Sequence, residues 1–384
     1  MSERYTVISS DCHAGAAIDT YKDYLEAKWH EDFDAWRGAY SNPFRDLQKT
    51  NTKRTRNWDN EQRISEQNGQ GVVAEVVFPN TVPPFFPTSS LVSRPPTADD
   101  YEQRLAGIRA HNRWLAEWCA EHPERRAGIG QIFLNDVDDA LDDIRFIAEN
   151  GLRGGVLIPG APEDSGLPGL HHSTYEPIWQ LCADLDVVMN HHTGSASPDY
   201  GDEPAGSVIW IIEQGWFAHR ALTHLIIGGV FERHPDLKLV LTEQGAGWVP
   251  DAIRMLDMMA MGVRSGKMGE LGFDPDQAIP RQPSEYWAEN CYVASQIPPM
   301  TDEELAAIGV GKIMWGSDYP HDEGCYPNTQ AALQRAFHDK DPADVRRILS
   351  ENAADVYGFD LDALAPLAAE HGPSVELIAT APAA

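Results

Sequence analysis

Acidic residues and histidines stand directly after several short apolar runs of this 384-residue chain. The first run belongs to the stretch VISSDCHAG at residues 7–15 and is followed by Asp11 and His13. Because side chains alternate along an extended strand, these two share one side while Cys12 faces the other. A carboxylate and an imidazole spaced in this way can bind one metal ion together, although a capped strand end would show the same residues.

Two adjacent histidines end the fifth apolar run, in the stretch VVMNHHTGS. His191 and His192 must point to opposite sides of a strand, so at most one of them should bind the ion that Asp11 and His13 bind. Val187, Met189 and His191 share a face, and on this ground we favour His191 as the ligand, with His192 as a packed, hydrogen-bonded residue.

An aspartate follows the eighth run, in the stretch IMWGSDYPHDEG. Burial of Asp318 after such a run would be costly unless the carboxylate were paired or bound to a cation. Together Asp11, His13, His191 and Asp318 form a mixed nitrogen and oxygen set. Such a set indicates one divalent metal ion, with Zn²⁺ expected first and Mn²⁺, Fe²⁺ or Mg²⁺ as alternatives.

Three residues near these strand ends are candidates for proton transfer. Asp318 would accept a proton from a metal-activated water and pass it to the leaving group. His321, one short turn later, or Glu243, which follows the sixth run in LKLVLTEQGAGW, would polarise the substrate or carry protons. Glu243 could instead orient a metal-binding histidine, or be a plain surface residue.

Strands and helices that alternate along the whole chain would have to position these groups. Short runs rich in Val, Ile and Leu are typical of strands buried on both faces of a parallel sheet. They occupy residues 7–10, 72–78, 128–133, 156–158, 187–190, 237–242, 292–294 and 313–316. Eight such strands separated by helical segments predict an α/β fold, a single (β/α)₈ barrel, whose chemistry sits at the C-terminal ends of the strands.

The barrel is expected to span residues 1–362, followed by an Ala/Pro-rich tail over 363–384. The length beyond about 250 residues must lie in loops, which we expect at the C-terminal face of the barrel. Stretches rich in aromatic residues, proline or glycine indicate three such insertions, at about 28–62, 79–98 and 263–288. Long loops of this kind are often functional covers.

The formal net charge of −29 argues against a nucleic-acid or anionic-membrane partner, because phosphate binding requires a basic face. No stretch reaches the roughly 20 apolar residues of a membrane helix, and the N-terminus lacks the pattern of a signal peptide. The five cysteines are scattered and odd in number. We therefore expect a cytoplasmic protein with reduced thiols that acts on a small molecule.

In combination, several motifs resemble those of the amidohydrolase-related proteins, the second amidohydrolase family. This branch includes aminocarboxymuconate semialdehyde decarboxylase and the resorcylate decarboxylases. The resemblance runs over roughly residues 5–360. The motifs that carry it are SDCH, NHHTG, GGVFERHPDLKLVLTEQGAGWVP, IMWGSDYPH and RRILSENAADVYGFD.

The resemblance implies a (β/α)₈ barrel with one divalent metal, usually zinc or manganese. It carries the ligand positions to Asp11, His13, His191 and Asp318, and similar members also show a histidine where His321 stands. The chain departs from the pattern at two places. Decarboxylases of the branch generally carry a histidine at the end of strand six, where this chain has Glu243, and the first ligand is more usually His or Glu than Asp.

These observations favour a metal-dependent hydrolase that uses a metal-activated water on a small, aromatic or carboxylated substrate. The alternative is a metal-dependent non-oxidative decarboxylase, in which the ion holds a carboxylate and a neighbouring oxygen. A catalytically inactive binding barrel is a further alternative, because fold alone does not prove activity. From the family resemblance and the aromatic loops we also expect a homodimer or a higher homo-oligomer.

Overall fold

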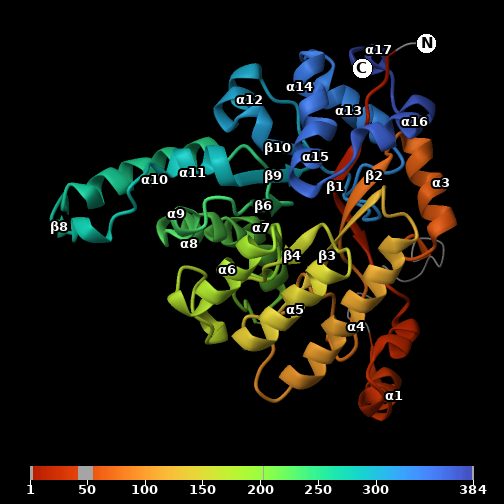
Figure 1. Ribbon diagram of the computed structural model, residues 1–384, viewed down its shortest axis with the longest axis horizontal. Coiled ribbons are helices and arrows are strands. Elements are labelled where there is room, and N and C mark those ends of the chain that lie inside the picture. The colour runs from red at the N-terminus through yellow and green to blue at the C-terminus, as the bar shows by residue number, and fades with distance from the viewer. Residues whose placement is uncertain (1–2, 42–54, 202, 383–384) are drawn as a thin grey trace.

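The computed structural model describes residues 3–41, 55–201 and 203–382. Its central element is a parallel sheet of eight strands in the order β1-β2-β3-β4-β5-β6-β9-β10. The sheet curls into a barrel, and the helices surround it (Figure 1). The prediction of a (β/α)₈ barrel is therefore confirmed. The strands span Ile8–Ala14, Ala74–Pro79, Arg126–Gln131, Gly155–Leu157, Met189–His192, Leu239–Thr242, Cys291–Ser295 and Ile313–Trp315.

The barrel closes where β1 meets the segment that follows β10. The backbone amide of Asp318 donates to the carbonyl of Asp11 at 2.8 Å, and the amide of His13 donates to the carbonyl of Tyr319 at 2.7 Å. A parallel bridge joins Cys12 to Tyr319. This seam thus joins the first and last strands at the residues that were singled out for their chemistry.

Both faces of the strands are apolar, because the barrel is filled inside and covered by helices outside. One buried cluster lies inside and includes Ile8, Val76, Ile129, Val188, Val240 and Met314. The other lies between strands and helices and includes Val7, Val77, Val156, Met189, Leu241 and Trp315. Apolar character therefore does not tell which face of a strand is the interior.

The helices alternate with the strands around this core. Caps in the sequence fix several of their starts: Asp136 accepts from the amides of Asp138 and Asp139 at the start of α5, and Thr301 forms a capping box with Glu304 at α12. Helices α1 and α3–α9 span His30–Ala39, Asn60–Gln70, Tyr101–Ala120, Val137–Glu149, Glu176–Asp184, Pro204–Ala218, Arg220–Ile227 and Val230–Arg233. Helices α10–α17 span Val249–Arg264, Pro283–Asn290, Asp302–Ile308, Thr329–Phe337, Pro342–Arg346, Asn352–Tyr357, Leu361–His371 and Val375–Ile378.

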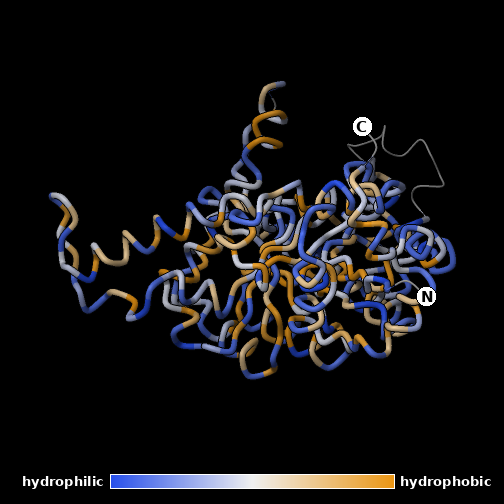
Figure 2. Tube along the Cα trace, turned by 90° about the horizontal axis from the view of Figure 1, so that it is seen from above, coloured by the Kyte–Doolittle hydropathy of each residue, from blue (hydrophilic) through white to orange (hydrophobic). Residues whose placement is uncertain are grey.

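Two of the three expected insertions follow strands β1 and β2, and so lie at the C-terminal face as predicted. The first contains α1, and its residues 42–54 lie outside the described residues. The third does not lie at that face. Residues 263–288 hold a short hairpin of β7 (Lys267–Met268) and β8 (Leu271–Gly272) at the far end of α10, which reaches away from the barrel (Figures 1 and 2). The expectation failed because the segment follows a helix, not a strand.

The segment after residue 363, expected as a tail, carries most of α16 and all of α17. Arg4 and Ser374 form an antiparallel bridge, and the amide of Tyr5 donates to the carbonyl of Pro373 at 2.9 Å. Alanine is a strong helix former, so an Ala-rich composition is compatible with this folded end.

Helices α7 and α10 each expose several apolar side chains. On α7 these are Val208, Ile209, Ile211, Ile212 and Trp216, and on α10 they are Met255, Met258, Met259 and Met261. In the part of the chain that the structure describes, no helix combines the length and the apolar character needed to span a membrane.

Candidate metal centre

A β-bulge in β1 turns Asp11 and His13 toward the barrel interior. The pairing of β1 with β2 shifts between Ser9 and Cys12, whereas Ile8 still lies in the interior cluster. The extra residue of a bulge moves the following side chains to the other face. Cys12 consequently points away, and its Sγ donates to Ser9 Oγ at 3.1 Å.

The imidazole of His13 lies between two carboxylates from the opposite ends of the chain. Its Nε2 is 3.2 Å from Asp11 Oδ1 and 3.1 Å from Asp318 Oδ1. All three side chains are buried. Three of the predicted ligands therefore meet at the mouth of the barrel.

The fourth member of the group is His192, where the sequence favoured His191. His192 Nε2 lies 3.8 Å from Asp11 Oδ1 and 3.1 Å from Glu243 Oε2. His191 points to the helix-covered side with Met189, and its Nδ1 donates to the carbonyl of Ile158 at 2.9 Å. The sequence pointed to the wrong face of β5 because the residues on both faces are apolar. Val187 and Met189 pack against the helices outside the barrel, and Val188 packs inside it.

Backbone carbonyls orient both imidazoles of the site. His192 Nδ1 donates to the carbonyl of Thr193 at 3.0 Å, and His13 Nδ1 donates to the carbonyl of Pro79 at 3.4 Å. A metal-binding histidine is commonly held in this way by its second ring nitrogen. This leaves each Nε2 as the ring nitrogen that faces the carboxylates and can bind a metal ion.

Two acidic residues at the rim, Glu243 and Asp318, have the left-handed backbone conformation. Glu243 and Asp318 both have φ of 56°, which is uncommon for residues other than glycine. The amide of Glu243 donates to the carbonyl of Ala294 at 2.9 Å, so the strained conformation is held by the neighbouring strand. Such strain concentrates at functional sites. It turns each acid over the barrel mouth.

His321 stands beside Asp318, as the sequence predicted from its position one turn later. Its Nδ1 is 2.7 Å from Asp318 Oδ1, and its Nε2 donates to Asn80 Oδ1 at 3.0 Å. The ring stacks on that of His13 with centroids 4.1 Å apart. His321 is thus placed between the buried site and the loop that follows β2.

The electrostatics of the site favour positive charge at its centre. Burial opposes ionisation of Asp11 and Asp318, yet the neighbouring histidines hold the pKa of each carboxyl below its usual value. Burial would lower the pKa of His13, but Asp11 and Asp318 raise it well above its usual value. Burial raises the pKa of Glu243. His191, in contrast, is desolvated away from the acids, and its pKa falls to about 4.

The donor set fits a divalent metal ion. Asp11, His13, His192 and Glu243 offer ligand atoms that all lie within 4.8 Å of one another, and so do His13, Asp318 and His321. Ligand atoms bonded at about 2.1 Å to one tetrahedral ion lie roughly 3.4 Å apart, which is near the distances seen here. Among the described residues, both oxygens of Asp11 and Asp318 and the Nε2 atoms of His13 and His192 have no hydrogen-bond partner. Buried polar atoms without partners are costly, so a cation would stabilise this arrangement.

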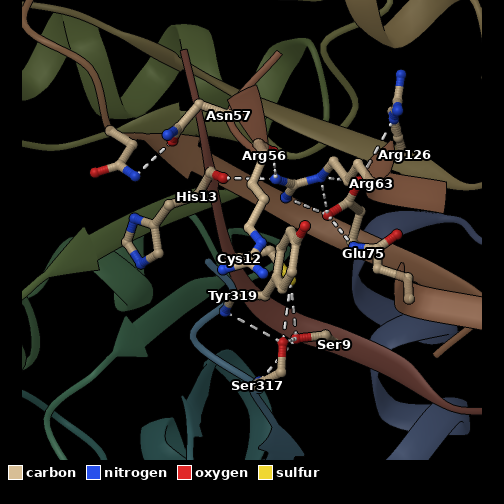
Figure 3. A network of polar contacts seen from close by, with 12 residues as sticks. Ser9, Cys12, His13, Arg56, Asn57, Arg63, Glu75, Arg126, Ser317 and Tyr319 are labelled. Carbon is tan, nitrogen blue, oxygen red and sulfur yellow. Dashed lines mark hydrogen bonds and ion pairs between the residues drawn. The ribbon is translucent and has the colours of Figure 1, made fainter. Parts of the chain in front are cut away.

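A second polar network fixes the strands behind the site (Figure 3). Arg63 donates to the carbonyl of His13 at 2.9 Å and to both oxygens of Glu75. Ser9 Oγ accepts a hydrogen bond from the backbone amide of Ser317 at 2.8 Å. It also forms a hydrogen bond of 2.8 Å with the hydroxyl of Ser317. This network holds the first and last strands together at the seam.

Fold and site together define a class of barrel enzymes that carry candidate metal ligands at the C-terminal mouth. The family model described as "Amidohydrolase" matches residues 11–359. The chain therefore belongs to the amidohydrolase-related family, in the branch of the aminocarboxymuconate semialdehyde decarboxylases, as the sequence motifs indicated.

Curated relatives of the chain are decarboxylases. The chain is 27% identical over 237 residues to gamma-resorcylate decarboxylase of Rhodococcus jostii, covering 57% of this chain and 68% of that protein. It is 26% identical over 322 residues to 2-amino-3-carboxymuconate-6-semialdehyde decarboxylase of Dictyostelium discoideum, covering 79% and 77% of the two chains. These similarities favour the decarboxylase alternative over the hydrolase.

Solved structures show the same fold. The structure of 5-carboxyvanillate decarboxylase from Novosphingobium aromaticivorans, with bound manganese and 3-methoxy-4-hydroxy-5-nitrobenzoic acid, superposes with a TM-score of 0.68. It is 20% identical and covers 92% of this chain and 97% of that chain. At this identity the likeness shows the barrel fold alone.

Two features of the site escaped the sequence. The face of β5 that bears His192 is set by the barrel, and no local pattern marks it. Asn80, which accepts from His321, follows β2 in a proline-rich stretch that carried no chemical motif. The position of Asn80 directly after a buried strand was a signal that could have found it.

Proposed function

We propose that this chain is a metal-dependent non-oxidative decarboxylase of small aromatic or enolic carboxylic acids. The observation that carries the proposal is that Asp11, His13 and His192 offer ligand atoms within 4.8 Å of one another, while Asp318 lies 3.1 Å from His13. The carboxylate oxygens and the Nε2 atoms of these four residues are buried and make no hydrogen bond within the described part of the chain. The choice of decarboxylation as the reaction is supported by the curated relatives, which are named as decarboxylases.

The proposed ligands of the ion are Asp11, His13, His192 and Asp318. When bound, the cation would hold the substrate carboxylate and a neighbouring oxygen and offset their negative charge. Nitrogen and carboxylate donors accommodate both Zn²⁺ and Mn²⁺. Manganese is the first ion to test, because it is bound in the related 5-carboxyvanillate decarboxylase.

Glu243 is the proposed proton donor to the carbon that loses carbon dioxide. Its side chain is 31% exposed, whereas those of Asp11 and Asp318 are 1% exposed. A group at the rim can reach the substrate and can recover its proton from solvent, which a sealed carboxylate cannot. Glu243 would thus stand in the place that relatives fill with a histidine. His321 would hold Asp318 in position through their 2.7 Å contact.

The test is carbon dioxide release from a panel of ortho-hydroxy aromatic acids by protein loaded with Mn²⁺ or Zn²⁺. We expect release with at least one acid, and its loss when Glu243 is replaced by Gln while the metal content stays the same. A metal-loaded protein that releases no carbon dioxide from the panel, yet cleaves esters or lactones, would contradict the proposal.

Hydrolysis is the second candidate, and one observation favours it. Glu243 Oε2 lies 3.1 Å from His192 Nε2 at the open rim, where a base for an attacking water would stand. The same panel distinguishes the two reactions, since only one of them produces carbon dioxide.

A further inference from the structure

A small pocket at the barrel mouth is lined in part by His192, one of the proposed metal ligands. It lies at the C-terminal ends of β3, β4 and β5 and beneath the loop that follows β2. Residues along it include Leu91, Arg104, Gln131, Phe133 and Leu157. A molecule held at the cation would thus have this pocket beside it.

The pocket contains a buried arginine with little compensating charge. Arg104 is 4% exposed, and its guanidinium lies over the rings of Phe86 and Phe133 at 4.3 and 5.7 Å. It contacts the carboxylate of Asp100 at 3.3 Å and donates to the carbonyl of Arg94 at 2.6 Å. The Asp100 side chain is 42% exposed, so solvent weakens its attraction.

Other arginines of the fold are better neutralised. Arg63, also buried, forms a pair of bonds with Glu75, and that carboxylate is buried with it. Arg94, which lines the same pocket, has a side chain that is 38% exposed, so water as well as Asp164 at 2.8 Å offsets its charge. A desolvated guanidinium is costly unless an anion accompanies it, so Arg104 is set up to receive one.

Hydrogen-bond donors without partners line the same pocket. Within the described residues, Arg104 Nε, Gln131 Nε2 and Ser90 Oγ are buried and make no hydrogen bond. Gln131 ends β3 on the interior face, since Ala127 and Ile129 of that strand belong to the interior cluster. The three groups can all donate to oxygen, and Arg104 adds positive charge.

The size of the pocket decides which part of a substrate it can take. The space open to the centres of water-sized groups is about 30 Å³. One water requires roughly 10–15 Å³ by that measure, so the enclosed space suits a group of about two or three oxygen-sized atoms. A carboxylate fits this space, while the ring that bears it would remain in the barrel mouth.

We propose that Arg104 and Gln131 form a subsite for a second carboxylate, and hence that the substrate is a dicarboxylic acid. One carboxylate would lie at the cation and the other at Arg104, with the ring between them. This inference rests on the proposed function for the position of the first carboxylate. The subsite itself is defined by the pocket and its donors, and it can be tested without turnover.

The test is equilibrium binding by calorimetry of isophthalate and terephthalate, compared with benzoate and 3-methylbenzoate. It is made on the full chain both as purified and after loading with Mn²⁺, and none of the four acids has to react. We expect at least one dicarboxylate to bind about tenfold or more tightly than both monocarboxylates, as charge-assisted hydrogen bonds to a buried guanidinium predict. Equal affinities in both preparations would overturn the subsite, whatever the decarboxylation assay shows.

Substitutions then test whether Arg104 binds the second carboxylate. Arg104→Met should remove the preference by weakening the dicarboxylate alone, and Arg104→Lys should restore part of it. Arg109→Met is the matched control, because Arg109 lies on the same helix and pairs with Asp139 and Asp143. Equal weakening of both acid classes by Arg104→Met, or loss of the preference in Arg109→Met, would contradict the assignment. If Arg104→Met does not fold, the wild-type comparison and Arg104→Lys still decide.

The two proposals can fail separately. A dicarboxylate preference that depends on Arg104, without carbon dioxide release from any acid, supports the subsite and contradicts the decarboxylase. Carbon dioxide release without a dicarboxylate preference supports the decarboxylase and contradicts the subsite.

Discussion

The backbone of Asp318 is hydrogen-bonded to the backbone of Asp11, with the amide of the former donating to the carbonyl of the latter at 2.8 Å. The two acids are separated by most of the chain, yet this bond fixes one against the other. The contact that closes the barrel therefore also assembles the proposed metal site. A chain that closes its barrel brings its last proposed ligand to its first.

Binding of the cation should stabilise the fold. The free energy of unfolding rises by about 2.7 kcal/mol when the free ion is at 100 times its dissociation constant. We expect Mn²⁺ or Zn²⁺ to raise the melting temperature of chelator-treated protein, and Mg²⁺ to do so less. Calorimetric scans with each ion check this, and a melting temperature indifferent to all three would contradict the metal site.

The two adjacent histidines of β5 should behave oppositely. His192→Gln should weaken metal binding by about 100-fold, because it removes a proposed ligand. His191→Gln should change it by less than about threefold, because His191 faces the helices. Metal titrations of both variants provide the measurement. The reverse order would return the ligand to His191, as the sequence first indicated.

Gly316 should be intolerant of any side chain at the seam. A Cβ on Gly316 would lie 2.4 Å from the Cβ of Asp11. Gly316→Ala should therefore destabilise the protein by about 1–3 kcal/mol and weaken metal binding. Gly311→Ala is the control, because the atom nearest to its Cβ is 4.0 Å away. Urea unfolding and metal titration of the two variants should differ, and equal behaviour would show that the seam can move aside.

Stability should fall in acid through Glu75. Burial opposes ionisation of Glu75, but Arg63 and Arg126 lower its pKa from 4.5 to about 2. A group whose pKa is lower in the folded state contributes stability that is present above pH 4.5 and lost between pH 4.5 and about 2. The contribution is about 3 kcal/mol.

Comparison with Glu75→Gln isolates this effect. The variant should be less stable than wild type at pH 6, and the difference should shrink as the pH falls toward 3. Urea unfolding across this range gives the measurement, with the exposed Glu370→Gln as a control. A difference that stays constant with pH would show that Glu75 is protonated in the folded protein.

The homo-oligomer expected from the sequence stays a prediction, and the apolar face of α7 is where we would test it. Ile211 and Ile212 are 62% and 73% exposed. Exposed apolar patches of this kind commonly mark protein interfaces. Sedimentation should show a dimer or larger species that Ile211→Asp with Ile212→Asp dissociates, whereas a monomeric wild type would refute the expectation.

The sequence by itself determined the eight strands and the acids and histidines that follow them. Apolar runs flanked by helical segments admit little besides a parallel barrel, and the strand ends of such a barrel face one mouth. Asp11, His13, Asp318, His321 and Glu243 could therefore be assigned to one site before any coordinates were known.

Only the tertiary structure decided the choice between His191 and His192. Both faces of β5 are buried and apolar. The alternation of side chains therefore separates His191 from His192 but does not show which of them points into the barrel. The structure also placed Arg63 behind His13 and put Arg104 into the same pocket as His192. The position of a residue along a helix does not tell what its side chain contacts. The local sequence pattern determines which residues share a face of a strand. The packing of strands that are distant in the chain determines which of these faces meet at the site.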